Sequence, residues 1–322
     1  MAVGILLVGG FGTRLQPLTL ESPKPMLPVA GLPVTEHQIL AAKRAGVHTL
    51  VLATSYLSEV FTPYFGDGSR WGMKILYAVE KEPLGTGGAI RNAAQLLNFS
   101  ELGDEPIVIS NGDVLSRHSI ADQISFHQSH KADVTLHLIE VEDARAFGCV
   151  PTDESGRVTA FLEKMENPVT NSINAGCYIF HPSVISEIPV DTVVSIERET
   201  FPALVASGRP LYGYKESAYW LDAGNPAALF KGSRDLIEGD FHQMSDCVID
   251  SSALITGKSS LGARVRIGAG VVLDDCILGD DVVVEDGAVL SQCFIFHGTR
   301  VAAGVNFSKK YISSARNEEI TL

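Results

Sequence analysis

The feature that most constrains the fold of this chain is a glycine-rich loop directly behind its first apolar run. Residues 7–19 read LVGGFGTRLQPLT, and residues 3–8 form an apolar run that predicts a buried strand. Glycines at a strand end let the backbone approach a bulky anion and point N–H groups at it. Arg14, and Lys24 between two prolines, add two positive charges beside those amides. The sequence therefore predicts a phosphate-binding loop after a first strand.

The spacing of these glycines excludes two other kinds of phosphate loop. The dinucleotide-binding fingerprint requires a third glycine that opens a helix, but Gly10 and Gly12 are followed by TRL. The Walker loop requires G-x-x-x-x-G-K followed by serine or threonine, and no such run occurs. We expect the loop to bind a triphosphate through Gly9, Gly10, Gly12 and Thr13, together with the two cations.

Strands and helices are expected to alternate through the first half of the chain. The pattern predicts strands at residues 4–8, 49–53, 74–78 and 106–110, and helices at 33–45, 58–65 and 87–97. Shorter strands follow at 133–140, 148–152, 158–162, 175–180 and 212–217, with a helix near 197–205. This order indicates an α/β fold with a mostly parallel sheet. Ligands of such sheets bind beyond the carboxyl ends of the strands, which makes the motifs after Val8, Val79 and Ser110 candidate site segments.

After about residue 245 short aliphatic residues recur every six positions. The series is Leu261, Ile267, Leu273 and, after a one-residue deletion, Leu278, Val284, Leu290 and Phe296. Such hexapeptide repeats are typical of a left-handed parallel β-helix, here of roughly three coils. We therefore predict a catalytic domain at 1–240 and a β-helix at 245–310. Because an open coil end must be capped or paired, we expect a homo-oligomer, a dimer or tetramer, through this β-helix.

The charge balance and the cysteines restrict the partners and the compartment. The formal net charge of −13 argues against nucleic acid and anionic membranes as partners, so the positive charge of a phosphate site must be local. Neither a membrane span nor a signal peptide is indicated. The five cysteines are scattered without a C-x-x-C pair, which indicates no zinc site or disulfide framework and suggests a reducing cytoplasm.

Three segments together resemble one enzyme family. VGGFGTRL at 8–15, FGCVPTD at 147–153 and INAGCY at 173–178 are similar to segments of the sugar-1-phosphate nucleotidyltransferases, the nucleoside-diphosphate-sugar pyrophosphorylases. The resemblance covers about residues 1–240 and is greatest to actinobacterial mannose-1-phosphate guanylyltransferases, the GDP-mannose pyrophosphorylases. It implies a Rossmann-like domain and transfer of a nucleotidyl group from a triphosphate, GTP being favoured, to a sugar 1-phosphate, mannose 1-phosphate being favoured. Mg²⁺ is the implied cofactor.

The reaction joins two anions, so cations and metal-holding carboxylates matter more than a protein base. The resemblance implies that Arg14 binds the β- and γ-phosphates and that Lys24 lies near the α-phosphate and the incoming oxygen. Asp113, in NGDVL after an apolar strand, and Asp222, in YWLDAG, would hold Mg²⁺. Arg14, Lys24 and Asp113 are therefore the expected catalytic residues.

The run EKEPLGTGGA at 80–89 resembles the family's base-reading loop. Gly85, with Thr86 beside it, would let the purine approach the backbone, and Glu80 stands where the family has a base-contacting side chain. A carboxylate accepts from N1–H and N2–H₂ of guanine, a donor pair that adenine lacks on that edge. Glu82 or backbone carbonyls remain alternative readers of the base.

The acceptor is expected to contact residues 161–164 and 174–176 by the same resemblance. Lys164 would pair with its phosphate and Glu163 with sugar hydroxyls, while Asn174 and the Gly148 backbone complete the hydroxyl contacts. Glucose 1-phosphate, heptose 1-phosphate or a cyclitol phosphate, in some cases with ATP, remain alternative substrates.

Two other classes of function are considered. A non-catalytic regulatory subunit that binds a nucleotide sugar usually lacks the arginine, lysine or aspartates of the signature, all of which are present here. A hexapeptide acyltransferase using His297 would need a longer tail. His127 and His130 are expected on a solvated helix face rather than at a metal.

Overall fold

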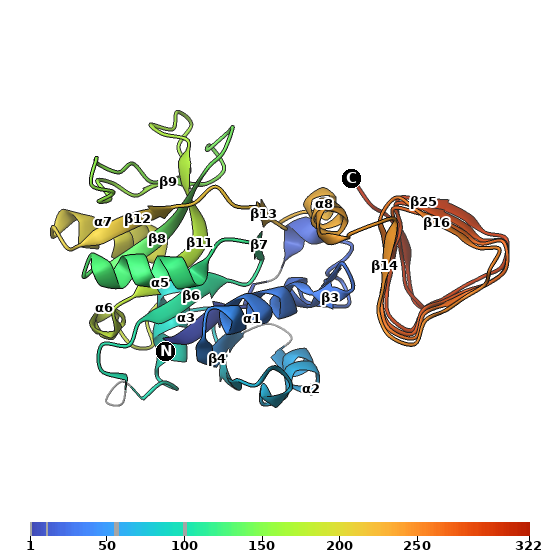
Figure 1. The fold of residues 1–322 in the computed structure, drawn as a ribbon, viewed down its shortest axis with the longest axis horizontal. Helices are drawn as coiled ribbons and strands as arrows, with labels where there is room; N and C mark the ends of the chain where they lie inside the picture. The colour runs from blue at the N-terminus through green and yellow to red at the C-terminus, as the bar shows by residue number, and fades with distance from the viewer. Residues whose placement is uncertain (1, 11, 55–57, 99–101) are drawn as a thin grey trace. The chain divides into compact units, whose positions relative to one another are not determined.

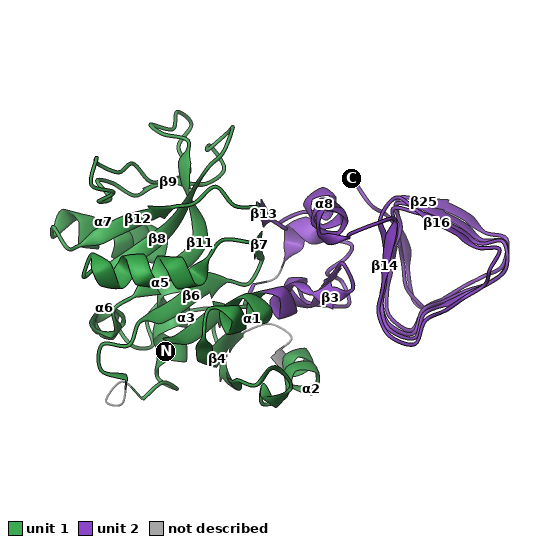
Figure 2. Ribbon diagram, viewed as in Figure 1, with its two compact units in different colours: residues 1–9, 38–220 green, residues 10–37, 221–322 purple. Residues whose placement is uncertain are grey.

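A computed structural model describes residues 2–10, 12–54, 58–98 and 102–322 of the chain (Figure 1). The chain divides into two compact units. One contains residues 1–9 and 38–220, and the other contains residues 10–37 and 221–322 (Figure 2). Most of the glycine-rich loop is thus grouped with the C-terminal part of the chain, although the sequence places residues 1–240 in one domain.

The first unit is built on a mixed sheet, in which the neighbouring strands β6, β1, β4 and β5 run parallel. Its strands are β1 (Ala2–Leu7), β4 (Val47–Thr54), β5 (Lys74–Val79), β6 (Ile107–Asn111), β8 (Val134–Glu140), β9 (Gly148–Cys149), β10 (Leu162–Glu163), β11 (Ser172–Phe180) and β12 (Leu211–Lys215). Within the described ranges the order is β10-β9-β11-β6-β1-β4-β5, and β8 pairs with β11 and β12. β1 is parallel to β4 and β6, and β4 is parallel to β5, whereas β11 is antiparallel to β6. The predicted α/β fold class is confirmed.

The described part of the first unit also contains several helices. They are α2 (Phe61–Phe65), α3 (Gly85–Ala94), α5 (Ile120–Ser129), α6 (Pro182–Glu187) and α7 (Phe201–Ala206), and α1 (Val34–Arg44) runs from the second unit into the first. Ile90, Ile185 and Phe201 join Ile109 and Tyr178 in one core, and each is 0% exposed. Burial of side chains of this size contributes about 2 kcal/mol each, which holds α3, α6 and α7 to the strands.

Four further short strands and one further α-helix belong to the described structure before the tail. They are β2 (Pro28–Val29), β3 (Leu32–Pro33), β7 (Val114–Ser116) and β13 (Trp220–Asp222), and α8 (Pro226–Leu236) follows β13. β2 and β3 form an antiparallel pair inside the second unit. Within the described part of the chain, no helix combines the length and the apolar character needed to cross a membrane.

The tail of the second unit is a parallel β-helix with three faces, drawn in orange and red in Figure 1. One face contains β14 (Phe241–Gln243), β17 (Ser259–Leu261), β20 (Ile277–Leu278), β23 (Phe294–Ile295), β26 (Lys310–Ile312) and β27 (Asn317–Glu319). The second contains β15 (Val248–Ile249), β18 (Arg266–Ile267), β21 (Val283–Val284) and β24 (Arg300–Val301). The third contains β16 (Leu254–Thr256), β19 (Val272–Asp274), β22 (Val289–Ser291) and β25 (Asn306–Ser308).

The β-helix departs from the predicted repeat in two ways. Leu261 pairs with Leu278, and Leu278 pairs with Ile295 rather than with the predicted Phe296. Each of these two coils is therefore one residue shorter than three full hexapeptides. The irregular start at 248–260 also forms strands, so the described residues give each face at least four strands against the three coils predicted.

Two predictions in the first unit are wrong. The strand expected at 158–162 does not form over that span: Val158 makes an isolated bridge to Thr152, and of the five residues Leu162 alone belongs to a strand, β10. The carboxylate of Asp153 accepts from the backbone of Ser155 and Arg157 at 2.9 and 3.0 Å, and this turn replaces a regular ladder.

His127 was expected on a solvated helix face and is instead buried. Its Nδ1 lies 3.0 Å from the hydroxyl of Thr135 on β8. The side chain faces the sheet because α5 packs directly on β8, and the helical position alone did not indicate which face was covered.

Candidate functional site

The glycine-rich loop folds back on itself within the second unit. Gly10 and Gly12 have φ angles of 110° and 59°, which residues with side chains rarely adopt. A Cβ on Gly12 would lie 3.0 Å from side-chain atoms of both Lys24 and Thr19. The Thr19 hydroxyl donates to the Gly12 carbonyl at 2.9 Å. Glycine at this position therefore allows the backbone to pack directly against Lys24.

Two cations and a carboxylate converge in this unit. The Nζ of Lys24 lies 3.7 Å from Oδ1 of Asp222, and Lys24 is only 8% exposed. A Cβ on Gly224 would lie 3.0 Å from Oδ1 of Asp222 and 3.2 Å from Nη2 of Arg14. Arg14 and the neighbouring Thr13 are themselves exposed. The arrangement can neutralise phosphate oxygens while a carboxylate remains beside them.

Asp113 lies in a turn that follows β6 in the first unit. The N–H of Gly112 donates to the carbonyl of Leu7 at 2.8 Å. A Cβ on Gly112 would lie 2.6 Å from that same oxygen, so only glycine fits. The turn that carries Asp113 is thus fixed at the carboxyl end of β1, where the chain continues into the exposed Gly9. This is the edge at which parallel sheets bind ligands.

Glu80 follows β5 at the same edge, and one of its carboxylate oxygens is satisfied by the protein. Oε2 accepts from the N–H of Leu84 at 3.4 Å. Oε1 is buried and accepts no hydrogen bond from the residues that the structure describes. Burial raises the pKa of Glu80 above its ordinary value, more than the Leu84 bond lowers it. A buried carboxylate oxygen of this kind is suited to a ligand that donates hydrogen bonds.

A second group of predicted residues lies on β9 and β10. Glu163 pairs directly opposite Gly148, and a Cβ on Gly148 would lie 2.7 Å from Oε2 of Glu163 and 3.0 Å from the ring of Phe161. Lys164 has a φ of 50°, and its Nζ lies 3.7 Å from Oε1 of Glu163. The structure therefore brings Gly148, Glu163 and Lys164 together, with the Lys164 side chain exposed.

Asn174 lies on the neighbouring strand β11, one residue after the pair formed by Ile173 and Cys149. Its Oδ1 accepts from the N–H of Gly176 at 3.1 Å, and its Nδ2 donates to the Tyr178 hydroxyl at 2.9 Å. Each polar atom of this side chain thus makes a hydrogen bond within the protein.

Comparisons with known proteins identify the family of this chain. The family model described as Nucleotidyl transferase matches residues 3–239. The chain belongs to the nucleotidyl transferase family. It is 47% identical to the mannose-1-phosphate guanylyltransferase of Mycobacterium tuberculosis, over 89% of this chain and 82% of that protein. It is 37% identical to mannose-1-phosphate guanylyltransferase 1 of Arabidopsis thaliana, over 92% of this chain and 82% of that protein.

Solved structures share the fold of this nucleotidyl transferase. A Bacillus anthracis protein in complex with sucrose has a TM-score of 0.65 and 22% identity, covering 74% of this chain and 98% of that chain. HddC from Yersinia pseudotuberculosis, complexed with GMP-PN, has a TM-score of 0.62 and 27% identity, covering 74% of this chain and 100% of that chain. The family resemblance predicted from the sequence is confirmed.

The loop at 85–88 packs against a segment to which the sequence assigned no role. A Cβ on Gly85 would lie 2.6 Å from the carbonyl of Val194, and Gly85 has a φ of 70°. The Thr86 hydroxyl donates to Oε2 of Glu197 at 2.6 Å and accepts from the N–H of Ile196 at 3.0 Å. Glycine is thus needed here for close packing within the protein, and the Thr86 hydroxyl is already bonded.

Glu197 lies where the sequence predicts an ordinary helix near 197–205, and that pattern gives it no separate role. The chain instead forms a π-helical turn, η5 (Ile196–Thr200), before α7 begins. The Ser195 hydroxyl also donates to Glu197, at 3.0 Å. Single π-helical turns are frequent at functional sites, but their residues carry no periodic signal in a sequence.

The predicted metal ligands fit Mg²⁺ by their chemistry. Asp113 of the first unit and Asp222 of the second are partly exposed carboxylates, which offer the oxygen ligands that Mg²⁺ prefers. Within the described ranges, no group of three or more His, Cys, Asp or Glu side chains is arranged to hold a metal by itself.

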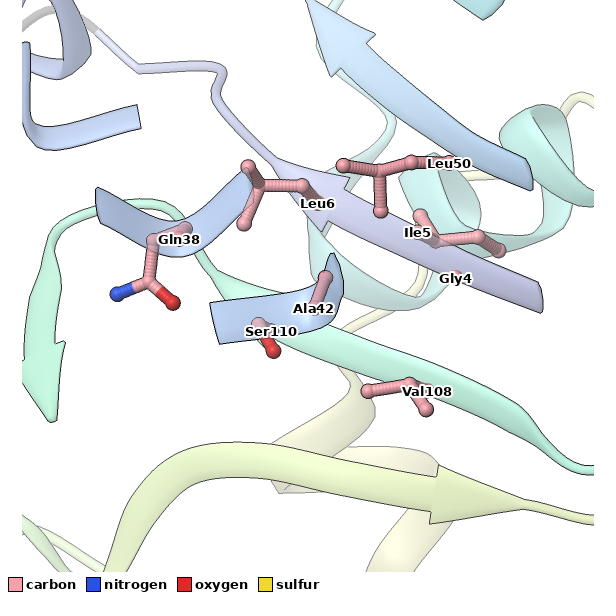
Figure 3. A pocket seen from close by; sticks show the side chains of 8 residues that line it. All are labelled: Gly4, Ile5, Leu6, Gln38, Ala42, Leu50, Val108 and Ser110. Atoms are coloured by element: carbon pink, nitrogen blue, oxygen red, sulfur yellow. The ribbon is translucent and has the colours of Figure 1, made fainter. Parts of the chain in front are cut away.

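A small cavity in the first unit is unrelated to these groups. It has a volume of about 10 Å³ and lies between α1 and the sheet (Figure 3). Its lining consists of Gly4, Ile5, Leu6, Gln38, Ala42, Leu50, Val108 and Ser110. A cavity of about this volume accommodates one water molecule at most, so it is no substrate site.

Proposed function

We propose that this nucleotidyl transferase transfers GMP from GTP to mannose 1-phosphate, giving GDP-mannose and pyrophosphate. The convergence of Arg14, Lys24 and Asp222 at Gly224 carries this proposal, because it supplies the charge that two reacting anions need. The names of the relatives from Mycobacterium tuberculosis and Arabidopsis thaliana support both substrates.

The proposed reaction requires alignment and charge neutralisation. The ionised phosphate oxygen of the sugar phosphate attacks the α-phosphorus, a new P–O bond forms, and the bond to the bridging oxygen breaks as pyrophosphate leaves with the electron pair. Lys24 is buried and paired with Asp222, so its ammonium is held in one place near the reacting phosphates. Arg14, being exposed, is available to the β- and γ-phosphates. Because the nucleophile is already ionised, no protein base is required.

We include Mg²⁺ as the proposed cofactor. Asp113 and Asp222 are the residues that would hold it, and when bound it would neutralise charge on the phosphate oxygens. Asp222 then has two roles, since it also pairs with Lys24.

Glu80 is the proposed reader of guanine. Its buried Oε1 lacks a donor among the described residues, and guanine offers two donors on one edge. The solved relative complexed with GMP-PN supports a guanine nucleotide. Gly148, Glu163, Lys164 and Asn174 are the proposed contacts of the sugar phosphate, Lys164 binding its phosphate and Glu163 its hydroxyls.

Pyrophosphate release tests these assignments. The full chain with Mg²⁺ is incubated with each of five nucleoside triphosphates and with mannose, glucose and heptose 1-phosphates and a cyclitol phosphate. We expect turnover to be fastest with GTP and mannose 1-phosphate. Faster turnover with another pair would replace the proposed substrates. Tight binding of a nucleotide sugar without any turnover would identify a regulatory subunit instead.

We also propose that the protein assembles through its β-helix and works in a reducing cytoplasm. Leu254, Val272 and Val289 lie in register on neighbouring strands of one outer face, and Leu254 is 56% exposed. An exposed aliphatic column on adjacent coils is suited to contact with a second copy of the chain. The five cysteines are free, as a reducing compartment requires.

A further inference from the structure

Glu21 lies just after the glycine-rich loop, between Arg14 and Lys24 in the sequence, and is hydrogen-bonded to the end of the β-helix. Its Oε1 accepts from the hydroxyl of Ser313 at 2.7 Å and from the hydroxyl of Tyr311 at 3.1 Å. The Nε of Arg316 lies 3.6 Å from the same oxygen. All of these residues belong to the second unit, and the contacts join segments that are about 290 residues apart.

The two residues of the β-helix that donate hydrogen bonds to Glu21 are buried. Tyr311 is 0% exposed and lies on β26, and Ser313 is 7% exposed. β27 pairs antiparallel with β26 and closes this face of the last coil. Burial and the nearby Glu21 raise the pKa of Tyr311, so its hydroxyl stays protonated and donates. The hydroxyls that hold Glu21 are therefore themselves fixed.

The loop side has little freedom between Glu21 and the two cations. The N–H of Leu20 donates to the carbonyl of Pro17 at 3.1 Å, and the N–H of Met26 donates to that of Pro23 at 2.9 Å. Leu18 is fully buried, and Thr19 is bonded to Gly12 as described above. These short turns and prolines make the segment stiff, so a displacement of Glu21 is passed on to its neighbours.

A second set of contacts ties the same segment to α8 and the first coil. The N–H of Ala30 donates to the Ser233 hydroxyl at 3.0 Å, and that hydroxyl lies 3.4 Å from the hydroxyl of Ser260 on β17. A Cβ on Gly31 would lie 2.9 Å from Met244, just behind β14. Residues 21–31 thus contact the β-helix at two places, which agrees with the grouping of residues 10–37 with the tail in Figure 2.

We infer, on the basis of the proposed function, that Glu21 is a positioning residue through which the last coil of the β-helix holds Arg14 and Lys24 in place for nucleotidyl transfer. Glu21 does not touch the reacting atoms in this role. The β-helix is then part of the phosphate-binding machinery in addition to any part in assembly. An event that displaces Tyr311 or Ser313 would lower the rate of transfer without altering the sugar-binding strands β9 and β10.

The test uses the full chain and four variants, Glu21→Ala, Glu21→Gln, Ser313→Ala and Tyr311→Phe. Ser291→Ala is the matched control, because Ser291 also donates a β-helix hydroxyl to a carboxylate, that of Asp274. Two quantities are measured: steady-state pyrophosphate release with each substrate varied, and hydrogen exchange of the backbone amides of residues 12–27.

We expect Glu21→Ala to lower kcat about tenfold, since small misplacements of a reacting arrangement have effects of this order or larger. The KM for the sugar 1-phosphate should stay within about twofold. Glu21→Gln should recover most of the rate, because an amide oxygen accepts from the same two hydroxyls. Adding Ser313→Ala and Tyr311→Phe to Glu21→Ala should cause no further loss. Both hydroxyls act through their hydrogen bonds to Glu21, and Glu21→Ala already removes these bonds.

A kcat for Glu21→Ala equal to that of Ser291→Ala would overturn the inference, and so would additive losses in the combined variant. Faster amide exchange in residues 12–27 of Glu21→Ala, but not of Ser291→Ala, supports it. If the wild-type chain releases no pyrophosphate, the proposed function fails, and the exchange comparison alone decides whether Glu21 anchors the loop. If Glu21→Ala does not fold, the double variant Ser313→Ala and Tyr311→Phe, which removes the same two hydrogen bonds, is compared with Ser291→Ala instead.

Discussion

The ammonium of Lys24 lies 3.7 Å from the carboxylate of Asp222, so two residues from opposite ends of the catalytic part of the sequence form one ion pair. Lys24 is almost completely buried, and its charge is therefore little screened by water. The pair places a fixed positive charge beside a carboxylate that is also the proposed metal ligand.

Replacement of Lys24 by methionine is expected to abolish most of the activity. We predict a loss of kcat of about 10²–10³, the size found when one charge-stabilising group is removed from an active site. The side chain keeps its length and its packing, so the fold should remain. Lys231→Met is the matched control, because Lys231 is an exposed lysine of α8 in the same unit. A Lys24→Met variant with more than half of the wild-type kcat would contradict the role of Lys24.

Substitution of Glu80 should change the selection of the base. Glu80→Gln replaces one acceptor oxygen by a donor, and we expect kcat/KM for GTP to fall by about 10–100-fold while ATP changes little. Glu82→Gln is the informative comparison, because Glu82 is the other acidic side chain of the loop. If Glu82→Gln alone lowers the preference for GTP, Glu80 is not the reader.

The same residue predicts a pH dependence. Burial raises the pKa of Glu80 above its ordinary 4.5, so the carboxylate is protonated at a higher pH than an exposed glutamate. kcat/KM for GTP should therefore decline as the pH falls towards that raised pKa, because a protonated carboxyl no longer accepts from both guanine donors. Glu80→Gln should lack this decline in a profile measured under identical buffer conditions.

His137 is expected to destabilise the protein in acid. Burial, with a smaller contribution from the charge of His118, lowers the pKa of His137 to about 3 in the folded chain. The unfolded chain then binds a proton below about pH 6.5 that the folded chain does not bind, so the free energy of unfolding falls as the pH is lowered from 6.5 towards 3.

His137→Phe isolates this effect, since the His137 ring stacks on that of His118 at 3.8 Å between centroids and phenylalanine keeps a ring there. Urea unfolding between pH 7.5 and 5 should show a shallower loss of stability in this variant than in the wild type. His130→Gln, at an exposed position of α5, is the control. Equal slopes in all three proteins would contradict the prediction.

A charge on the aliphatic column of the β-helix should disrupt assembly. We expect the wild-type chain to form dimers or tetramers in light scattering and Leu254→Glu to shift it towards the monomer, because a buried interface penalises an unpaired carboxylate. Val190→Glu introduces the same charge at an exposed valine of the first unit and should leave the mass unchanged. A monomeric wild-type protein would argue against assembly through the β-helix.

Local sequence patterns were sufficient to predict those parts of the site whose structure depends on residues close together in the sequence. The apolar run before Gly9, the glycines of the loop and the strand before Asp113 each have a local signature, because strand burial and turn geometry act over a few residues. The α/β order and the aliphatic repeat were readable for the same reason, although the positions of coil corners were not, as Ile295 in place of Phe296 shows.

Only the tertiary structure decided which predicted groups share a unit and how their polar atoms are used. Arg14 and Lys24 belong with Asp222 and the β-helix, the Thr86 hydroxyl is bonded to Glu197, and Glu21 is bonded to Ser313. The sequence by itself determined the chemistry available at each strand end, since that follows from residue type and spacing. It did not determine these contacts, because they join segments far apart in the chain and depend on how buried surfaces pack.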